Sequence, residues 1–274
     1  MEELEEQIRA IEEELRRTEY NKRTEKHIGK LKAKLARLRR ELEKRRRAAA
    51  SRRTEGIRKI GDGTVVIVGL PNSGKSTLFS ALTGLDTRIS ERPFTTTEPR
   101  SGTMEVGPML IQVIDTPPLV PGGRNGPILS LARMADALVV LLAPWDDPAE
   151  VLGILHEGGI RPNAPGSPRG ILVRSMRDLG GAPPGLPLAL PSEAPRLAAL
   201  IPRILGLIVV YTRPPRARER EPMVLRRGSR VSDALRRLGI GEYRKIVLER
   251  SGLRREVDPE EPLSEGDTIT VYRR

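Results

Sequence analysis

The stretch from Gly69 to Thr77 reads GLPNSGKST and matches the pattern G-x-x-x-x-G-K-[ST]. An apolar run precedes it and a helical pattern follows it, which is the context in which this pattern binds phosphate. Glycines let backbone N–H groups curl around phosphate oxygens, and the start of the helix adds positive potential. Lys75 can reach β- and γ-phosphates, and the Ser76 hydroxyl can ligate Mg²⁺. The predicted nucleotide site contains Gly69, Pro71, Asn72, Ser73, Gly74, Lys75, Ser76 and Thr77.

Two further segments supply groups that such a site needs. The loop RPFTTTEP begins at Arg92, and one of its threonines could complete the Mg²⁺ shell when a nucleoside triphosphate is bound. Asp115 ends an apolar run, where a carboxylate can hold Mg²⁺ through water. The three elements, in this order and at this spacing, predict a site that binds a nucleotide together with magnesium.

Apolar runs separated by helical segments must position these groups. Such runs are typical of an α/β fold with a mostly parallel sheet. Asp146 and Asp147 precede Pro148 and are expected to cap a helix there. Residues 158–196 are rich in Pro and Gly and should be mostly loop. The expected strands are Thr64–Val68, the pair Met104–Val106 and Leu110–Ile114, then Ala137–Leu142, Ile171–Val173 and Leu207–Tyr211.

The N-terminal residues 1–56 are predicted to form a helical hairpin. Residues 17–24 carry no apolar stripe and contain residues that favour caps and turns. On either side of them an apolar residue recurs every three or four positions, as on one face of a helix. A continuous coiled coil is the alternative. The two stripes are Leu4, Ile8, Ile11 and Leu15, and Leu31, Leu35, Leu38 and Leu42.

The C-terminal part is expected to be a separate small module. Residues 214–221 are charged and contain prolines, so they read as a linker. Residues 222–274 then contain one helix and several strands, which favours a small α+β fold. The expected elements are the strand Met223–Leu225, the helix Ser232–Leu238, and the strands Lys245–Glu249 and Thr268–Tyr272.

Charge is distributed unevenly along the chain. The 274 residues include 48 Lys and Arg against 36 Asp and Glu, a formal net charge of +12. Residues 16–60 alone hold nineteen Lys and Arg against five Glu. This density predicts a polyanionic partner, with nucleic acid favoured over a merely solvated helix face. Cysteine is absent, and no apolar run is long enough to span a membrane. The N-terminus does not resemble a signal peptide, so a cytoplasmic location is expected.

Segments along nearly the whole chain resemble the Obg-family GTPases, most closely the developmentally regulated GTP-binding (DRG) proteins. The matching segments are RRTEYNKRTEKHIGKLKAKLARLRREL, GLPNSGKST, PFTT, VVYTR and LRRGSRVSDALRRLG…LSEGDTITVY. The resemblance implies a P-loop G domain at residues 57–213 and a TGS domain, which is a β-grasp module, at residues 222–274. It also implies a cytoplasmic, K⁺- and Mg²⁺-dependent GTPase that binds GTP and GDP and acts on ribosomes.

Roles carried over from the family fall on matching positions. Ser76 and Thr96 would ligate Mg²⁺, and Asn72 would place a K⁺ ion beside the phosphates, so that Asn72, Lys75 and Thr96 form the catalytic set. Phe94 and Thr95 would line the nucleotide. The ribosome and its RNA would be bound by the basic arm and the TGS domain. We expect a monomer that does not bind membranes. Whether it also binds a small partner protein is left open by the resemblance.

The sequence also departs from the family pattern. Pro118 stands where the family has a glycine whose N–H senses the γ-phosphate, and Leu119 stands where many GTPases have a water-orienting glutamine. The guanine motif Asn-Lys-x-Asp appears as Ser-Met-Arg-Asp at 175–178, so Asp178 can still accept from guanine but the bracing asparagine is lost. Ser192 begins only a loose match to the last guanine-binding motif. The inserted subdomain of the family is replaced by the loop Arg161–Arg169.

Three functions are therefore compatible with the sequence. The first is a GTPase that turns over on the ribosome. The second is a nucleotide-binding ribosome factor of a hibernation or stabilising type, with little or no hydrolysis. The third is a structural RNA-binding protein with an unused pocket. The intact loop at residues 69–77 argues against the third, because an unused site has no physical need for Lys75.

Overall fold

The computed structural model describes residues 10–14, 27–28, 31, 34–36, 38, 59–85, 99–176, 186–187 and 191–273. The chain divides into two compact units, Met1–Arg58 and Lys59–Arg274. In the first unit the described residues are helical, and Nε2 of His27 lies 3.1 Å from Oε1 of Glu14. A continuous helix would hold residues at this spacing about 20 Å apart. The two segments that contain Glu14 and His27 therefore lie side by side.

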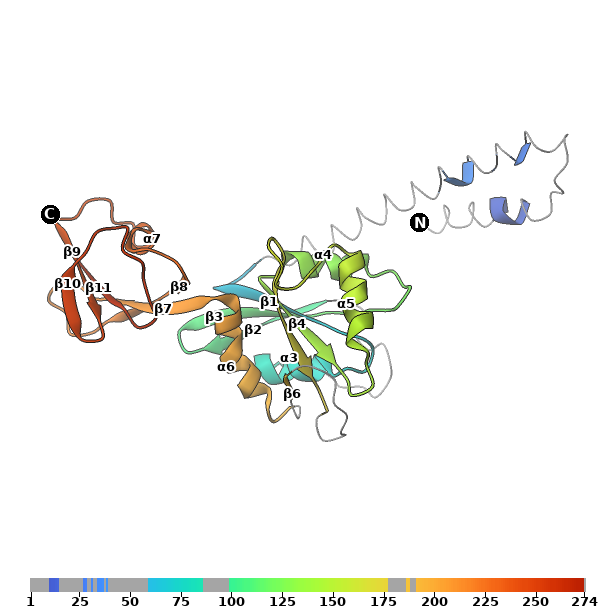
Figure 1. Ribbon diagram of the computed structural model, residues 1–274, viewed down its shortest axis with the longest axis horizontal. Helices are drawn as coiled ribbons and strands as arrows, with labels where there is room; N and C mark the ends of the chain where they lie inside the picture. The colour runs from blue at the N-terminus through green and yellow to red at the C-terminus, as the bar shows by residue number, and fades with distance from the viewer. Residues whose placement is uncertain are drawn as a thin grey trace. The chain divides into compact units, whose positions relative to one another are not determined.

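The second unit begins with a six-stranded sheet in the order β2-β3-β1-β4-β5-β6 (Figure 1). All its strand pairs are parallel except β2 with β3, which is antiparallel. The expected α/β fold with a mostly parallel sheet is thus confirmed, as is the strand pair around Gly107. The strands are β1 (Gly63–Val68), β2 (Arg100–Val106), β3 (Met109–Asp115), β4 (Ala137–Leu142), β5 (Arg169–Arg174) and β6 (Leu186–Pro187).

Helices cover both faces of this sheet. α3 (Lys75–Thr83) and α6 (Ala194–Leu205) pack on one face, while α4 (Gly126–Met134) and α5 (Pro148–Glu157) lie on the other (Figure 1). Asp147 caps α5, because its Oδ1 accepts a hydrogen bond from the N–H of Ala149 at 2.9 Å. The parallel strands β1, β3, β4 and β5 all end at the sheet edge that carries the loop between β1 and α3.

A second, five-stranded sheet has the order β10-β9-β11-β7-β8. β7 and β11 run parallel to each other, and every other neighbouring pair is antiparallel. The helix α7 (Val231–Arg237) packs on it. The TGS assignment of this part stays a prediction. The strands are β7 (Leu207–Thr212), β8 (Glu221–Arg226), β9 (Lys245–Arg250), β10 (Leu253–Glu256) and β11 (Thr268–Tyr272).

The prediction that Leu207–Tyr211 completes the first sheet is wrong. This run forms β7, which pairs with β8 and β11. Leu207 and Val209 join the core beneath α6, whereas Ile208 and Val210 join the core beneath α7. A continuous apolar run indicates a strand buried on both faces, but it does not say in which sheet the strand lies.

The expected linker at 214–221 is also corrected by the strand pairing. Thr212 pairs with Glu221 and Tyr211 with Pro222, so the residues between them connect the two strands of one hairpin. We call residues 207–273 the C-terminal module. Its strand β10 is absent from the predicted elements, because all four of its residues are exposed and show no apolar alternation.

Polar contacts join the C-terminal module to the amino edge of the first sheet. Asp136, just before β4, accepts a hydrogen bond from the Thr64 N–H at 2.9 Å and lies 3.2 Å from both Lys59 and Arg226. A second guanidinium of the module, Arg237, lies 3.6 Å from Asp62. The two sheets are therefore tied together by charge as well as by the shared apolar packing of β7.

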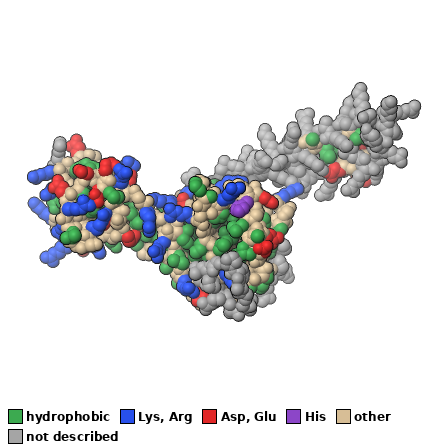
Figure 2. Space-filling view, in the orientation of Figure 1, with side chains coloured by type: hydrophobic (Ala, Val, Ile, Leu, Met, Phe, Trp, Pro, Cys, Tyr) green, Lys and Arg blue, Asp and Glu red, His purple; other side chains and the backbone are tan. Residues whose placement is uncertain are grey.

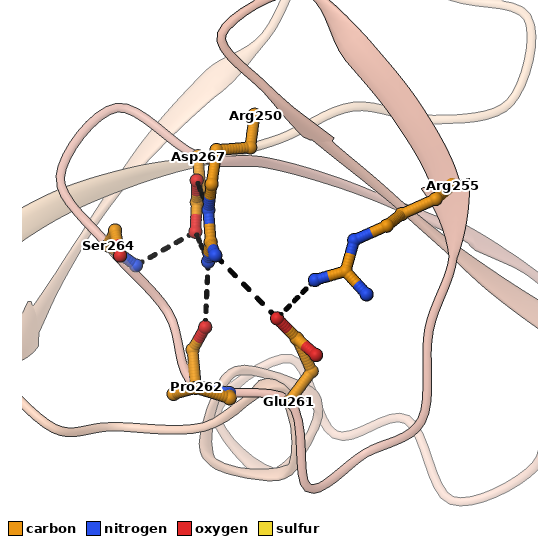
Figure 3. Close-up of polar contacts among 6 residues, drawn as sticks. All are labelled: Arg250, Arg255, Glu261, Pro262, Ser264 and Asp267. Atoms are coloured by element: carbon orange, nitrogen blue, oxygen red, sulfur yellow. Dashed lines mark hydrogen bonds and ion pairs between the residues drawn. The ribbon is translucent and has the colours of Figure 1, made fainter.

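Inside the module, a buried carboxylate organises the loop before β11 (Figure 3). Asp267, which is 1% exposed, accepts two hydrogen bonds from Arg250, at 2.9 and 2.7 Å, and one from the Ser264 N–H at 2.8 Å. Arg250 also donates to the carbonyl of Pro262. Its hydrogen bonds to Asp267 raise the pKa of Arg250, so the guanidinium that holds this loop stays charged.

We expect the Asp136 contacts to make stability depend on pH. Burial raises the pKa of Asp136, but the Thr64 N–H, Lys59 and Arg226 more than offset this, so the pKa in the folded chain lies below its ordinary value. The charged form therefore stabilises the fold above about pH 4, and this stabilisation is lost as the pH falls through the folded-state pKa. Because Asp136 is partly exposed, Asp136→Asn should lower the free energy of unfolding by about 1 kcal/mol at pH 7.

Urea unfolding of the wild type and Asp136→Asn between pH 7 and pH 3 measures this effect. The difference in the free energy of unfolding between the two proteins should become smaller as the pH falls. Asp258→Asn is the control, since Asp258 is exposed and has no ion pair among the described residues. A difference that stays constant with pH would contradict the assignment.

Candidate functional site

The loop between β1 and α3 curls tightly at the carboxyl edge of the first sheet. A side chain on Gly69 would put its Cβ 2.3 Å from the Leu141 carbonyl oxygen, so only glycine fits there. Gly74 has φ 87° and caps α3, and Asn72 has φ 61°. Left-handed backbone at these points turns the chain back on itself so that its N–H groups can face a bound anion. The helix α3 begins at Lys75, directly after this loop, and a helix N-terminus favours a bound anion.

Lys75 lies within this loop. Its side chain is 7% exposed, and its Nζ donates to the Leu70 carbonyl at 2.7 Å and to Oγ of Ser73 at 3.3 Å. Burial lowers the pKa of Lys75 to about 8, although the carboxylates of Asp115 and Asp146 draw it upward. A buried ammonium group held at the loop is suited to pair with phosphate oxygens.

Ser76 and Asp115, which the sequence predicts as Mg²⁺ ligands, lie in contact. The Ser76 hydroxyl donates to Oδ2 of Asp115 at 2.8 Å, and Asp115 is fully buried at the end of β3. Burial raises the pKa of Asp115, and the hydrogen bond from Ser76 and the charge of Lys75 offset this in part. Among the described residues, Oδ1 of Asp115 has no hydrogen-bond partner. An unsatisfied buried oxygen beside a hydroxyl fits a hard cation such as Mg²⁺, which takes few protein ligands and keeps waters.

The segment after β3 is fastened to the loop that precedes α3. The Thr116 hydroxyl donates to the Ile67 carbonyl at 2.8 Å, and the N–H of Leu119 donates to the Gly69 carbonyl at 3.0 Å. The Leu119 side chain is fully buried. Next to it, Asn125 both accepts from the Val120 N–H and donates to the Val120 carbonyl. Pro118 therefore lies in a segment held at both ends, and it has no N–H to offer a ligand.

Ser175 stands where the family has its bracing asparagine, and it still joins the two nucleotide loops. The Ser175 side chain is 1% exposed, and its hydroxyl donates to the Ser73 carbonyl at 2.7 Å, with the Leu142 carbonyl 3.3 Å away. A shorter side chain thus performs the bracing expected of asparagine. Met176 follows with φ 53°, a strained conformation for a residue with a side chain.

Asp146 is a neighbour of the site that the sequence pattern assigned only to a helix cap. Its Oδ2 accepts from the Ala143 N–H at 2.8 Å in the turn after β4. Burial raises the pKa of Asp146, and attraction to Lys75 offsets part of that rise. Asp147, not Asp146, caps the following helix. The capping pattern could not separate two adjacent aspartates, since both precede the same proline.

The remaining predicted site residues divide into two groups. Pro71 and Thr77 are half-buried and Asn72 is exposed, all in or next to the loop before α3, and Ser192 lies in the turn just before α6. The other group lies outside the described residues, so its position is still a prediction: Phe94, Thr95, Thr96 and Asp178.

Other kinds of site receive no support from the described part of the chain. It contains no group of three or more His, Cys, Asp or Glu side chains that could hold a metal by themselves. No helix within it combines the length and the apolar character needed to cross a bilayer. The phosphate loop with its Ser76–Asp115 pair therefore remains the candidate site.

Comparisons with known proteins agree with this geometry. The family model described as "50S ribosome-binding GTPase" matches residues 64–161. Human "Developmentally-regulated GTP-binding protein 2" is 38% identical over 91 residues, which cover 31% of this chain and 25% of that protein. "GTPase Obg" of Bifidobacterium animalis subsp. lactis is 39% identical over 67 residues, or 24% of this chain and 12% of that protein.

A solved structure is similar as well. The FeoB G-domain from Methanococcus jannaschii is 18% identical with a TM-score of 0.40, and the match covers 53% of this chain and 99% of that one. The chain spans a quarter or less of the length of the two curated relatives. Within the region that the family model matches, the sequence, the P-loop fold and the phosphate site agree. The chain therefore carries a GTP-binding GTPase domain of the type found in Obg and the developmentally regulated GTP-binding proteins.

Proposed function

We propose that this protein is a slow GTPase that acts on the ribosome in the cytoplasm, in the manner of the Obg and developmentally regulated GTP-binding proteins. Lys75 pairs with the β- and γ-phosphates of GTP, and the backbone of residues 69–74 binds the phosphate oxygens. The basic arm Lys22–Arg53 and the C-terminal module contact ribosomal RNA. Asn72 would help to hold a K⁺ ion, which would supply further positive charge at the phosphates.

One observation carries the proposal. Lys75, Ser76 and Asp115 are placed together around a loop that has room for no side chain at Gly69. Bound Mg²⁺ would supply charge neutralisation at the phosphates, and Ser76, Thr96 and Asp115 are the residues that would hold it. A buried ammonium and an unsatisfied carboxylate oxygen at one point are costly, and an anionic ligand with its cation would offset that cost. The description of the matching family model supports the ribosome as partner.

The second candidate function is a nucleotide-binding ribosome factor without turnover. It is favoured by the segment at 116–119, whose two ends are hydrogen-bonded to Ile67 and Gly69 and which lacks an N–H at Pro118. A segment held in this way has less freedom to follow the γ-phosphate. The two candidates share the nucleotide site and differ only in hydrolysis.

Single-turnover hydrolysis of GTP with and without ribosomes tests the proposal. Ser76→Ala removes the hydroxyl proposed to bind Mg²⁺, and this should weaken Mg²⁺-dependent GTP binding by about tenfold or more. Ser80→Ala is the matched control, one turn further along α3. Ribosomes should accelerate hydrolysis by the wild type and by Ser80→Ala, and much less by Ser76→Ala.

Two results would contradict the proposal. If ribosomes bind the protein but leave hydrolysis unchanged, the second candidate function is favoured. If GTP and GDP do not bind at micromolar concentration, both candidates fail.

Restoring a backbone N–H at position 118 should change the preference of the protein for GTP over GDP. A backbone N–H to a charged oxygen contributes about 1.5–3 kcal/mol, and Pro118 cannot provide it. We expect the wild type to bind GTP and GDP within about tenfold of each other, and Pro118→Gly to favour GTP by a further factor of about ten. Competition titrations with a fluorescent GDP measure both affinities.

Pro117→Gly is the control for this experiment. It loosens the same segment without adding a donor at the sensing position. An equal shift of the GTP:GDP ratio in the two variants would mean that flexibility, not the restored N–H, sets the preference. A wild type that already prefers GTP by a hundredfold would overturn the interpretation.

Asp178 should select guanine. Its carboxylate can accept from guanine N1–H and the 2-amino group, whereas adenine offers no matching pair of donors. We expect GDP to bind more tightly than ADP, with micromolar affinity, and Asp178→Asn to weaken GDP while leaving ADP nearly unchanged. Isothermal titration of both nucleotides against both proteins measures this. Equal affinities of the wild type for GDP and ADP would refute it.

A further inference from the structure

Strand pairing brings several distant segments together at one end of the C-terminal module. Thr212 and Glu221 close the hairpin of β7 and β8, and Thr212 also pairs with Ile269 of β11. β11 continues past this level to Tyr272, which pairs with Lys245 at the start of β9. The hairpin connection, the start of β9 and the end of β11 therefore lie at the same end of the sheet.

This end is rich in cations. We call it the basic end, and it comprises Arg216, Arg218, Arg220, Arg244, Lys245 and Arg273. All of its arginines are exposed, and Lys245 is half-buried. The carboxylates of the same end are Glu219, Glu221 and Glu242, half the number of the cations. Figure 2 shows many exposed Lys and Arg side chains on the module, interspersed with Asp and Glu.

Ion pairing distinguishes the basic end from the rest of the module. Eight arginines of the module each lie within 4 Å of a carboxylate: Arg213, Arg226, Arg230, Arg236, Arg237, Arg250, Arg254 and Arg255. Within the described residues, the six cations of the basic end have no such pair. A solvated face would mix paired and unpaired cations at random. In the described part of this module, Arg227 is the one unpaired cation outside the basic end, and Arg213 is a paired cation next to it.

Two of these cations are held in place by aromatic rings. The guanidinium of Arg220 lies 4.1 Å from the ring centre of Tyr211, and Nζ of Lys245 lies 5.0 Å from that of Tyr272. Such contacts hold a cation without neutralising it. Pro214 and Pro215 restrict the backbone at the start of the hairpin connection. The basic end is thus partly ordered before any ligand binds.

From this arrangement we infer that the basic end of the C-terminal module binds single-stranded RNA through its phosphates. The end spans four neighbouring strands, β8, β7, β11 and β9, or about 14 Å, which matches a few successive phosphates. Proteins that bind single-stranded nucleic acid combine exposed cations with aromatic rings, and bases can also stack on the guanidinium planes of arginines. The inference deepens the proposed function and rests on it for the RNA's identity as ribosomal.

Two triple variants of the full chain test the inference. Arg216→Ser, Arg218→Ser and Arg220→Ser together remove three unpaired cations from the basic end. Arg230→Ser, Arg236→Ser and Arg254→Ser together remove the same charge from exposed, ion-paired positions elsewhere in the module. The probe is a fluorescein-labelled single-stranded RNA 20-mer of mixed sequence, measured by fluorescence anisotropy across a salt series without ribosomes or nucleotide.

The first triple variant should bind the RNA at least about tenfold more weakly than the wild type at 100 mM salt, and its slope of log K against log salt should be smaller by about 2. The control should stay within about twofold of the wild type. Equal losses in the two variants would overturn the inference, because net charge alone would then explain binding. Tighter binding of a 20-bp RNA duplex, or a parallel loss of binding to phosphatidylserine vesicles, would also overturn it.

These outcomes are separable from those of the proposed function. RNA binding is measured without GTP. A failure of ribosomes to stimulate hydrolysis would therefore not contradict the inference that the basic end binds single-stranded RNA. Loss of RNA binding in both triple variants would leave the GTPase proposal untouched. GDP affinity, measured in the same proteins, should be equal in all three and confirms that the variants are folded.

Discussion

The missing side chain of Gly69 is the constraint on which the nucleotide site depends. The Leu141 carbonyl of β4 occupies the space that a Cβ would need, and the Gly69 carbonyl accepts from the N–H of Leu119. Four residues on, the Ser73 carbonyl accepts from Ser175. The phosphate loop is therefore held by three separate segments of the first sheet's carboxyl edge. Its shape is set before a ligand arrives, which reduces the entropy lost on binding.

The same packing explains the charged groups of the site. Lys75, Asp115 and Asp146 are all buried. Burial lowers the pKa of Lys75 and raises the pKa values of Asp115 and Asp146, so it favours the neutral form of each group. Their mutual attraction offsets part of this cost but does not remove it. In the structural ion pair Arg250–Asp267, both carboxylate oxygens accept hydrogen bonds, whereas Asp115 keeps one oxygen without a partner in the described part of the chain. That contrast distinguishes the Arg250–Asp267 pair, which holds the fold, from Asp115, which we propose helps to hold Mg²⁺.

Much of this arrangement could be predicted from the sequence, because local chemistry determines it. The GLPNSGKST motif, the apolar run ending at Asp115 and the strand pair around Gly107 all follow from patterns within about ten residues. The place of β7 could not be predicted, since apolar Leu207–Tyr211 is compatible with either sheet. The brace from Ser175 depends on a contact with Ser73, which is 102 residues away, and no local pattern shows it. The exposed strand β10 carries no apolar signal at all.

The double burial of β7 has a consequence for how this protein is divided. One face of the strand completes the core under α6, and the other completes the core under α7. If the part with the first sheet and the part with the second sheet were separated, only one of them could keep β7. The other would expose the apolar surface that β7 covers. The two sheets should therefore melt as one cooperative unit. A fragment that ends before Leu207 would leave the core beneath α6 open, and one that begins after Thr212 would leave the core beneath α7 open.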